Sequence, residues 1–152
     1  MRPGVRLCVD VGAVRIGVAR SDASGTLAVP EATLDARKNW LEAFARLVTE
    51  YEPMEILVGL PVSLDGHEHA AAQRVREIAG RISEALPDLP VRLIDERLTT
   101  SAAQVQMRQA GVSSRKGRPV IDQAAAVIML QEALDSERAT GRIPGAPTNG
   151  RT

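Results

Sequence analysis

The sequence predicts an α/β protein built on a five-stranded mixed sheet, three antiparallel strands followed by two parallel ones, with helices on both faces. The first three apolar stretches are joined by connections too short for crossovers, so these strands should pair antiparallel. Two later apolar stretches each follow a segment of helical periodicity, which favours parallel strands reached by helical crossovers. A chain of 152 residues without internal repeat or linker is large enough for one domain with its own core.

Three strands open the predicted sheet. Residues 5–11 form a mostly apolar strand that Asp10 interrupts near its end, and strands at 15–21 and 26–31 follow. The run D-A-S-G at 22–25, between the second and third strands, is typical of a hairpin turn.

Helices and strands alternate in the rest of the chain. Apolar residues recur at helical spacing in the predicted helices, and short continuous apolar runs indicate buried strands. A proline opens the last helix, where its missing N–H costs nothing. In chain order we expect a helix at 39–52, a strand at 55–60, a helix at 67–86, a strand at 91–95, a helix at 100–111 and a helix at 119–137.

The C-terminal residues offer little to bury. Residues 139–152 hold three glycines and two prolines with few apolar side chains. We therefore expect a disordered tail at 139–152 behind a single domain at 1–138.

Composition excludes several kinds of protein. Cys8 is the only cysteine, which excludes an internal disulfide and favours a buried residue of a central strand. No run of about 18 apolar residues is present to span a membrane. The N-terminus lacks the apolar region of a signal peptide. We expect a cytoplasmic protein with no membrane partner.

Charge is unevenly distributed, although the net charge is zero. Residues 31–68 hold eight acids against three basic residues, whereas 97–121 hold five basic residues and no acid. The balance is not that of a uniformly basic nucleic-acid binder, but a local basic strip can still bind phosphates. The predicted nucleic-acid-binding residues are Arg97, Arg108, Arg115, Lys116 and Arg118.

Aromatic residues make up only 2% of the chain. Trp40, Phe44 and Tyr51 fall on one face of a predicted helix and are most simply core residues. No aromatic is then left for a platform that stacks bases, as binders of single strands commonly use. We expect recognition of backbone, shape or junction geometry instead.

Three acidic residues have positions that favour catalysis. Asp10 lies near the end of a buried strand, where an unpaired carboxylate is costly. Glu96 follows the strand at 91–95, and Asp122 lies in the first turns of the last helix. Each also has a purely structural interpretation. Asp10 could bond the turn that follows it, Glu96 could pair with an arginine, and the helix dipole alone favours Asp122.

Together these acids predict a metal site. Sites in open α/β sheets form beyond the carboxyl ends of the parallel strands, where Asp10 and Glu96 both lie. Converging carboxylates repel one another unless cations bind between them, and oxygen ligands suit Mg²⁺ or Mn²⁺. Two such ions stabilise both the attacking and the leaving oxygen in phosphodiester cleavage. Asp95 and Glu96 point to opposite faces of a continuing strand, so only one can easily meet Asp10.

Four stretches, in order, resemble the YqgF/RuvX family. They are D-V-G-A-V-R-I-G-V-A-R-S-D at 10–22, V-G-L-P-V-S-L-D-G at 58–66, D-E-R-L-T-T at 95–100 and D-Q-A-A-A-V-I-M-L-Q at 122–131. Members are assigned as Holliday junction resolvases or as nucleases for the precursor of small-subunit ribosomal RNA. The resemblance covers about 5–134 and implies an RNase H-like fold. It also implies that Asp10, Glu96 and Asp122 are the catalytic, metal-binding carboxylates, which selects Glu96 over Asp95.

The expected activity is a metal-dependent endonuclease acting on structured nucleic acid. Processing of the 5′ end of pre-16S rRNA is favoured, because the sequence shows no clear surface for a dimer. The alternative is a homodimeric Holliday junction resolvase, since two symmetric cuts call for two-fold symmetry. A third interpretation, from another class, is a non-catalytic nucleic-acid-binding module. An actin-like ATPase would need two such domains around its nucleotide, and one domain of this length cannot supply them.

Overall fold

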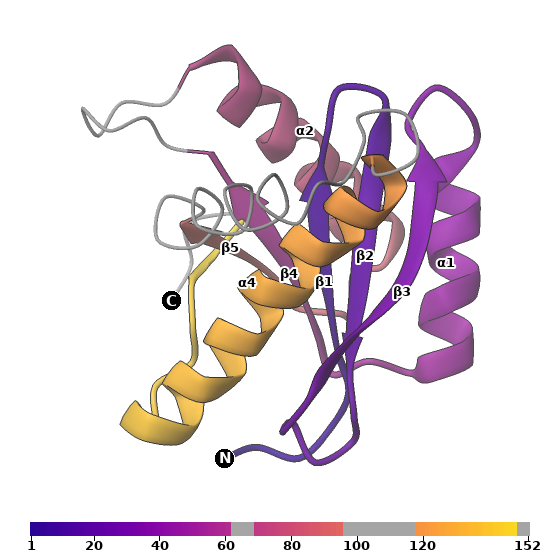
Figure 1. Cartoon of the computed structure of the whole chain (residues 1–152). Coiled ribbons are helices and arrows are strands. Elements are labelled where there is room, and N and C mark those ends of the chain that lie inside the picture. The colour runs from indigo at the N-terminus through magenta and orange to yellow at the C-terminus, as the bar shows by residue number, and fades with distance from the viewer. Residues whose placement is uncertain (62–68, 96–117, 149–152) are drawn as a thin grey trace.

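The computed structural model (Figure 1) describes residues 1–61, 69–95 and 118–148. Six strands form one sheet in the order β3-β2-β1-β4-β5-β6. The strands are β1 (Arg6–Val11), β2 (Arg15–Ser21), β3 (Ala28–Asp35), β4 (Glu55–Leu60), β5 (Val91–Asp95) and β6 (Ala146–Pro147). The helices are α1 (Trp40–Tyr51), α2 (Ala70–Ala85) and α4 (Arg118–Thr140).

The sheet is mixed, as the lengths of the connections predict. β1 pairs antiparallel with β2, and β2 with β3, whereas β1, β4 and β5 are parallel to one another. The first five strands and their directions are therefore confirmed. β3 runs longer than its apolar pattern indicates, and β6 is an additional strand.

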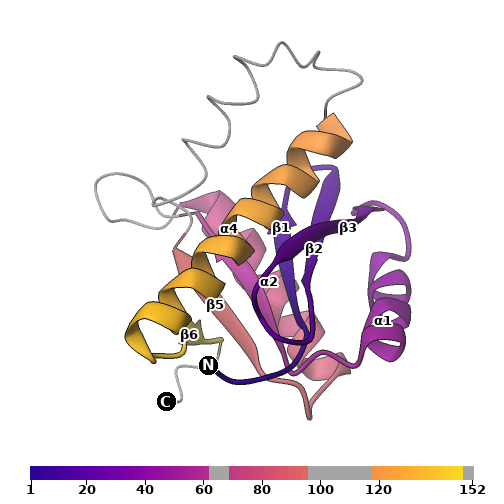
Figure 2. The same ribbon diagram turned by 60° about the horizontal axis from the view of Figure 1, so that its bottom comes forward.

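Helices cover both faces of the sheet, as predicted. α1 and α2 lie on one face and α4 crosses the other (Figures 1 and 2). Alternate residues of each strand pack into two hydrophobic cores, one on each face of the sheet. Leu7 and Val9 pack toward α1 and α2, whereas Cys8 and Leu57 pack toward α4. The prediction that Cys8 is a buried residue of a central strand is confirmed, because it is fully buried in β1.

The aromatic residues serve the fold. Trp40 and Phe44 of α1 are buried in the core, as predicted. Tyr51 is half-buried, and its hydroxyl donates to Glu31 at 2.8 Å while the Arg20 guanidinium lies 4.5 Å from its ring centre. A base-stacking surface is thus absent from the parts of the chain that the structure describes.

α4 packs one face against the sheet. Ala125 and Leu134 are buried there, whereas Ala124 and Ile128 are only half-buried. The helix is apolar on several sides, so its pattern alone does not select the buried face. The residues that are buried are Ala125, Ala126, Met129, Leu130, Ala133, Leu134 and Glu137. Within the described ranges, no helix is long and apolar enough to cross a membrane.

The expectation of a disordered tail from residue 139 fails as far as residue 148. α4 continues to Thr140, and β6 pairs antiparallel with β5. Arg92 of β5 donates to the carbonyl oxygens of Pro144 at 2.7 Å and Gly145 at 2.6 Å. Composition does not reveal this strand, because its partner is the open edge of β5, about fifty positions earlier in the chain.

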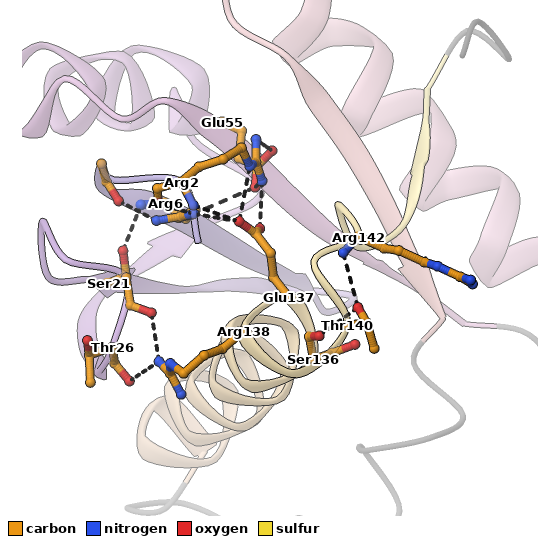
Figure 3. Close-up of polar contacts among 12 residues, drawn as sticks. Arg2, Arg6, Ser21, Thr26, Glu55, Ser136, Glu137, Arg138, Thr140 and Arg142 are labelled. Carbon is orange, nitrogen blue, oxygen red and sulfur yellow. Dashed lines mark hydrogen bonds and ion pairs between the residues drawn. The ribbon is translucent and has the colours of Figure 1, made fainter.

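A network of buried ion pairs joins the N-terminus to α4 at the amino ends of β1 and β4 (Figure 3). Arg2 donates to Glu137 at 2.7 Å and to Glu55 at 2.8 Å. Arg6 donates to Glu137 at 3.2 Å. Arg6, Glu55 and Glu137 are almost fully buried, so each charge depends on the others for compensation.

We expect Glu137→Ala to lower the free energy of unfolding by about 3–5 kcal/mol, because it leaves buried arginine charge uncompensated. Urea denaturation measures the change. Glu132→Ala, an exposed position on the same helix, is the matched control and should stay within about 0.5 kcal/mol of wild type. Equal stability of the two variants would contradict the importance of the network.

The same carboxylate predicts a pH dependence. Hydrogen bonds from Arg2 hold the pKa of Glu137 below its ordinary value. The unfolded chain therefore takes up this proton at higher pH than the folded chain does. The stabilisation is complete above the unfolded pKa of about 4.3 and is lost as the pH falls through the lowered folded value. The stability gap between wild type and Glu137→Gln should narrow from about pH 6 to about pH 3, measured by denaturation at each pH. A stability difference between the two proteins that does not change with pH would contradict this prediction.

Candidate functional site

The carboxyl ends of the parallel strands meet at one edge of the sheet (Figure 1). Val9 of β1 pairs with Val58 of β4, and Gly59 pairs with Ile94 of β5. This register brings Asp10, Gly59 and Ile94 level with one another. The predicted location of a site, beyond the carboxyl ends of parallel strands, is therefore where Asp10 lies.

Asp10 faces α4. Cys8, two residues earlier in β1, belongs to the core under α4, and strand residues two apart share a face. Asp10 is half-buried, and its partner across the antiparallel pair is Gly17 of β2. A carboxylate in this position is partly withdrawn from water yet still reachable.

The positions on either side of Asp10 carry no side chain. Gly17 and Gly59 lie on its two neighbouring strands and on the same face of the sheet. Neither position can cover the carboxylate, and glycine in a strand allows close approach of another backbone. We call the level set Thr33, Gly17, Asp10, Gly59 and Ile94 the Asp10 row.

A side-chain contact brings the start of α4 to this row. Gln123 donates from Nε2 to Oγ1 of Thr33 at 2.7 Å. Thr33 is the partner of Gly17, which in turn is the partner of Asp10. Asp122 directly precedes Gln123 in α4, so the helix backbone that carries this acid begins at the same edge as Asp10.

The structure describes Asp95, the first of the two acids at the end of β5. Leu93 packs in the core toward α2 and Ile94 packs against the core toward α4. By alternation the Asp95 side chain belongs to the α2 face, opposite that of Asp10. Because it ends the strand, Asp95 lines a pocket of about 480 Å³ with Arg76 of α2 and also one of about 420 Å³ with Met129 of α4. Glu96 lies outside the described residues, so the selection of Glu96 over Asp95 stays a prediction.

The remaining predicted residues have the following places. Glu96, Arg97, Arg108, Arg115 and Lys116 lie outside the described residues, as does the predicted helix at 100–111. Arg118 is the first residue of α4. Among the side chains that the structure describes, no three acids, histidines or cysteines are grouped to hold a metal. Of the three predicted metal ligands, Asp10 is the one whose side chain the structure describes. Its carboxylate oxygens suit a hard divalent ion.

Two parts of the site were not foreseen from the sequence. Thr33 and Gln123 are polar residues with no distinctive spacing, and they meet only because β3 and α4 are packed together. Gly17 carried a usable signal, since a glycine inside an apolar strand indicates close approach.

A family model described as "RuvX: Holliday junction resolvase" matches residues 4–136. The chain belongs to the RuvX family. A Streptomyces coelicolor relative named "Putative pre-16S rRNA nuclease" is 52% identical, covering 95% of this chain and 88% of the relative. A Nocardioides relative of the same name is 50% identical, covering 95% and 96%. This RuvX-family chain is thus similar to nuclease relatives over nearly its whole length.

Solved structures support the fold of the RuvX-family chain. Thermus thermophilus RuvC in complex with a Holliday junction substrate matches with a TM-score of 0.55 at 15% identity, covering 94% of this chain and 98% of that chain. The Holliday junction resolvase of fowlpox virus matches with a TM-score of 0.51 at 15% identity, covering 86% and 99%. At identities this low, the matches show the fold alone. They confirm the predicted RNase H-like fold.

The contact between Gln123 and Thr33 should hold the start of α4. We expect Gln123→Ala and Thr33→Val each to lower the free energy of unfolding, with a coupling of about 1 kcal/mol in a double-mutant cycle, because one hydrogen bond is lost in both. Denaturation of the four proteins measures the coupling. Strictly additive effects would show that the contact contributes nothing.

Proposed function

We propose that this RuvX-family nuclease is a metal-dependent endonuclease that acts at the Asp10 row on structured RNA, with the 5′ end of pre-16S rRNA as its substrate. The observation that carries the proposal is the half-buried Asp10 carboxylate, flanked by Gly17 and Gly59 at the carboxyl ends of the parallel strands. The contact of Gln123 with Thr33 supports Asp122 as a second acid of this site.

The names of similar relatives support pre-16S rRNA as the substrate. Those named for pre-16S rRNA are about half identical to this chain and align along nearly all of it. The description of the family model favours a second candidate, a homodimer that resolves four-way DNA junctions. The two share one chemistry, hydrolysis of a phosphodiester in a branched or folded nucleic acid.

The chain's own residues have distinct roles in this chemistry. Asp10, Glu96 and Asp122 would hold one or two Mg²⁺ or Mn²⁺ ions, which supply Lewis-acid stabilisation of the attacking and leaving oxygens. β1 lies between β2 and β4, so hydrogen bonds on both sides fix the backbone of Asp10. Gly17 and Gly59 are themselves buried, so the substrate would reach the half-buried carboxylate of Asp10 from beyond the strand ends.

Basic residues would hold the substrate. Arg97, Arg108, Arg115, Lys116 and Arg118 follow β5 or open α4, and they carry the phosphate contacts in this proposal. Such contacts read backbone and shape rather than base sequence. That mode of recognition agrees with the lack of a stacking surface among the described residues.

We expect Asp10→Asn and Asp122→Asn each to reduce cleavage about 1,000-fold. Loss of a metal ligand removes several kcal/mol of transition-state stabilisation, and each 1.4 kcal/mol is worth tenfold in rate. The assay uses two labelled probes with Mg²⁺ or Mn²⁺: an RNA carrying the 5′ precursor end of 16S rRNA, and a synthetic four-way DNA junction. Asp88→Asn, an exposed acid between α2 and β5, is the matched control and should keep wild-type activity.

The outcomes distinguish the candidates. Cleavage of the RNA alone supports the proposed substrate, whereas cleavage of the junction alone makes the chain a resolvase. If the wild-type protein binds both probes and cuts neither in the presence of metal, the chain is a binding module and the nuclease proposal is wrong.

A further inference from the structure

Two turns lie beside Asp10 at the same edge of the sheet. β3 runs parallel to β1, because both pair antiparallel with β2, so the turn after β1 and the turn after β3 are neighbours (Figure 1). Arg15 is the strand partner of Asp35, and Ala36 N–H donates to the carbonyl oxygen of Val14 at 2.8 Å. The backbone thus joins residues 12–15 and 35–38 into one continuous surface.

Arg15 belongs to the face of the sheet that carries Asp10. Ile16 and Val18 pack into the core toward α1 and α2, so Arg15 and Gly17 lie on the opposite face. Gly17 is the partner of Asp10, and Arg15 is two residues closer to the edge on the same strand. Its guanidinium is therefore carried beside the Asp10 row.

Arg15 is half-buried, yet its guanidinium makes no hydrogen bond or ion pair with any residue that the structure describes, although its backbone carbonyl accepts from Gly12 N–H. The nearest acid in the strand pairing, Asp35, is already bound by Arg37. Arg37 donates to Asp35 from its backbone N–H at 2.9 Å and from its side chain at 3.2 and 3.3 Å. These bonds lower the pKa of Asp35, so it stays ionised and occupied by Arg37.

The surface has an excess of positive charge. Arg15, Arg37 and Lys38 face a single acid, Asp35, and both Arg37 and Lys38 are exposed. A guanidinium that is partly withdrawn from water and lacks a carboxylate partner is suited to a phosphate, which it can bind through two parallel N–H donors. Lys38 adds a second positive charge in the turn that follows β3.

We propose that Arg15, assisted by Lys38, binds the phosphate backbone of the substrate on the β2–β3 side of Asp10. This inference rests on the proposed nuclease function and adds Arg15 and Lys38 to the basic residues proposed at 97–118 as contacts to the substrate. The substrate strand then crosses the edge of the sheet from the turn after β3 to the carboxyl ends of β1 and β4.

The test measures binding and cleavage separately. Binding is measured in an Asp10→Asn background with the 16S precursor RNA over a range of salt concentrations. We expect Arg15→Ala to weaken binding about tenfold and to reduce the slope of log affinity against log salt by about 0.7–0.9, the value of one phosphate contact. Arg15→Lys should restore most of the slope, because it keeps the charge.

Cleavage with native Asp10 supplies the second readout. Arg15→Ala should raise KM with little change in kcat, since the contact lies away from the reacting bond. The control is Arg46→Ala, an exposed arginine of α1 that pairs with Glu42, and it should leave both affinity and KM unchanged. Denaturation of each variant verifies that it is folded.

Failure of this inference differs from failure of the proposed function. If wild type binds and cuts the RNA while Arg15→Ala has the same affinity and salt slope, the Arg15 contact is wrong and the nuclease stands. If wild type neither binds nor cuts the RNA or the four-way junction, the proposed function fails, and the Arg15 contact fails with it.

Discussion

Glu137 fixes the position of α4, and the candidate site depends on where that helix lies. Its carboxylate accepts hydrogen bonds from Arg2 and Arg6 at the amino ends of the strands. Toward the other end of the helix, about 20 Å away along its axis, Gln123 bonds Thr33. A rigid rod held at two such points cannot slide or rotate over the sheet. The backbone at the start of α4 is therefore held in place relative to β1, although the charges of Glu137, Arg2 and Arg6 lie at the opposite ends of the strands.

Local sequence signals were enough for the parts of the structure that rest on local physics. Strand directions followed from connection lengths, and the position of Asp10 at a strand end followed from its apolar surroundings. What the sequence did not reveal depends on packing between distant segments. β6 forms because β5 offers an open edge, Arg6 is paired through a helix 131 positions away, and Gln123 meets Thr33 across 90 positions. The pleat separated Asp95 from the face of Asp10 only once Leu93 and Ile94 were assigned to their cores.

Charge in the sequence and charge on the surface are organised differently in this chain. The segment 97–121 stands out because it holds five basic residues and no acid. In the sequence, Arg15 and Lys38 are separated by the turn between β2 and β3 and by three acidic residues, so no window of the sequence reveals them as a pair. Strand register brings their turns together, and the Arg37–Asp35 ion pair removes the acid that would otherwise neutralise Arg15.

The two-residue strand β6 has a consequence for association between copies of the chain. An uncovered strand edge is a template for pairing with another molecule, and β5 would present one without β6. The chain enters β6 through Gly145, which has a φ of 78°. Gly145 lies so close to the Leu93 carbonyl of β5 that any side chain at this position would collide with it. The outer edge at β3 is interrupted by Pro30 and carries the charge of Glu31. Resistance to edge-to-edge aggregation on the β5 side thus depends on a single glycine outside the catalytic machinery.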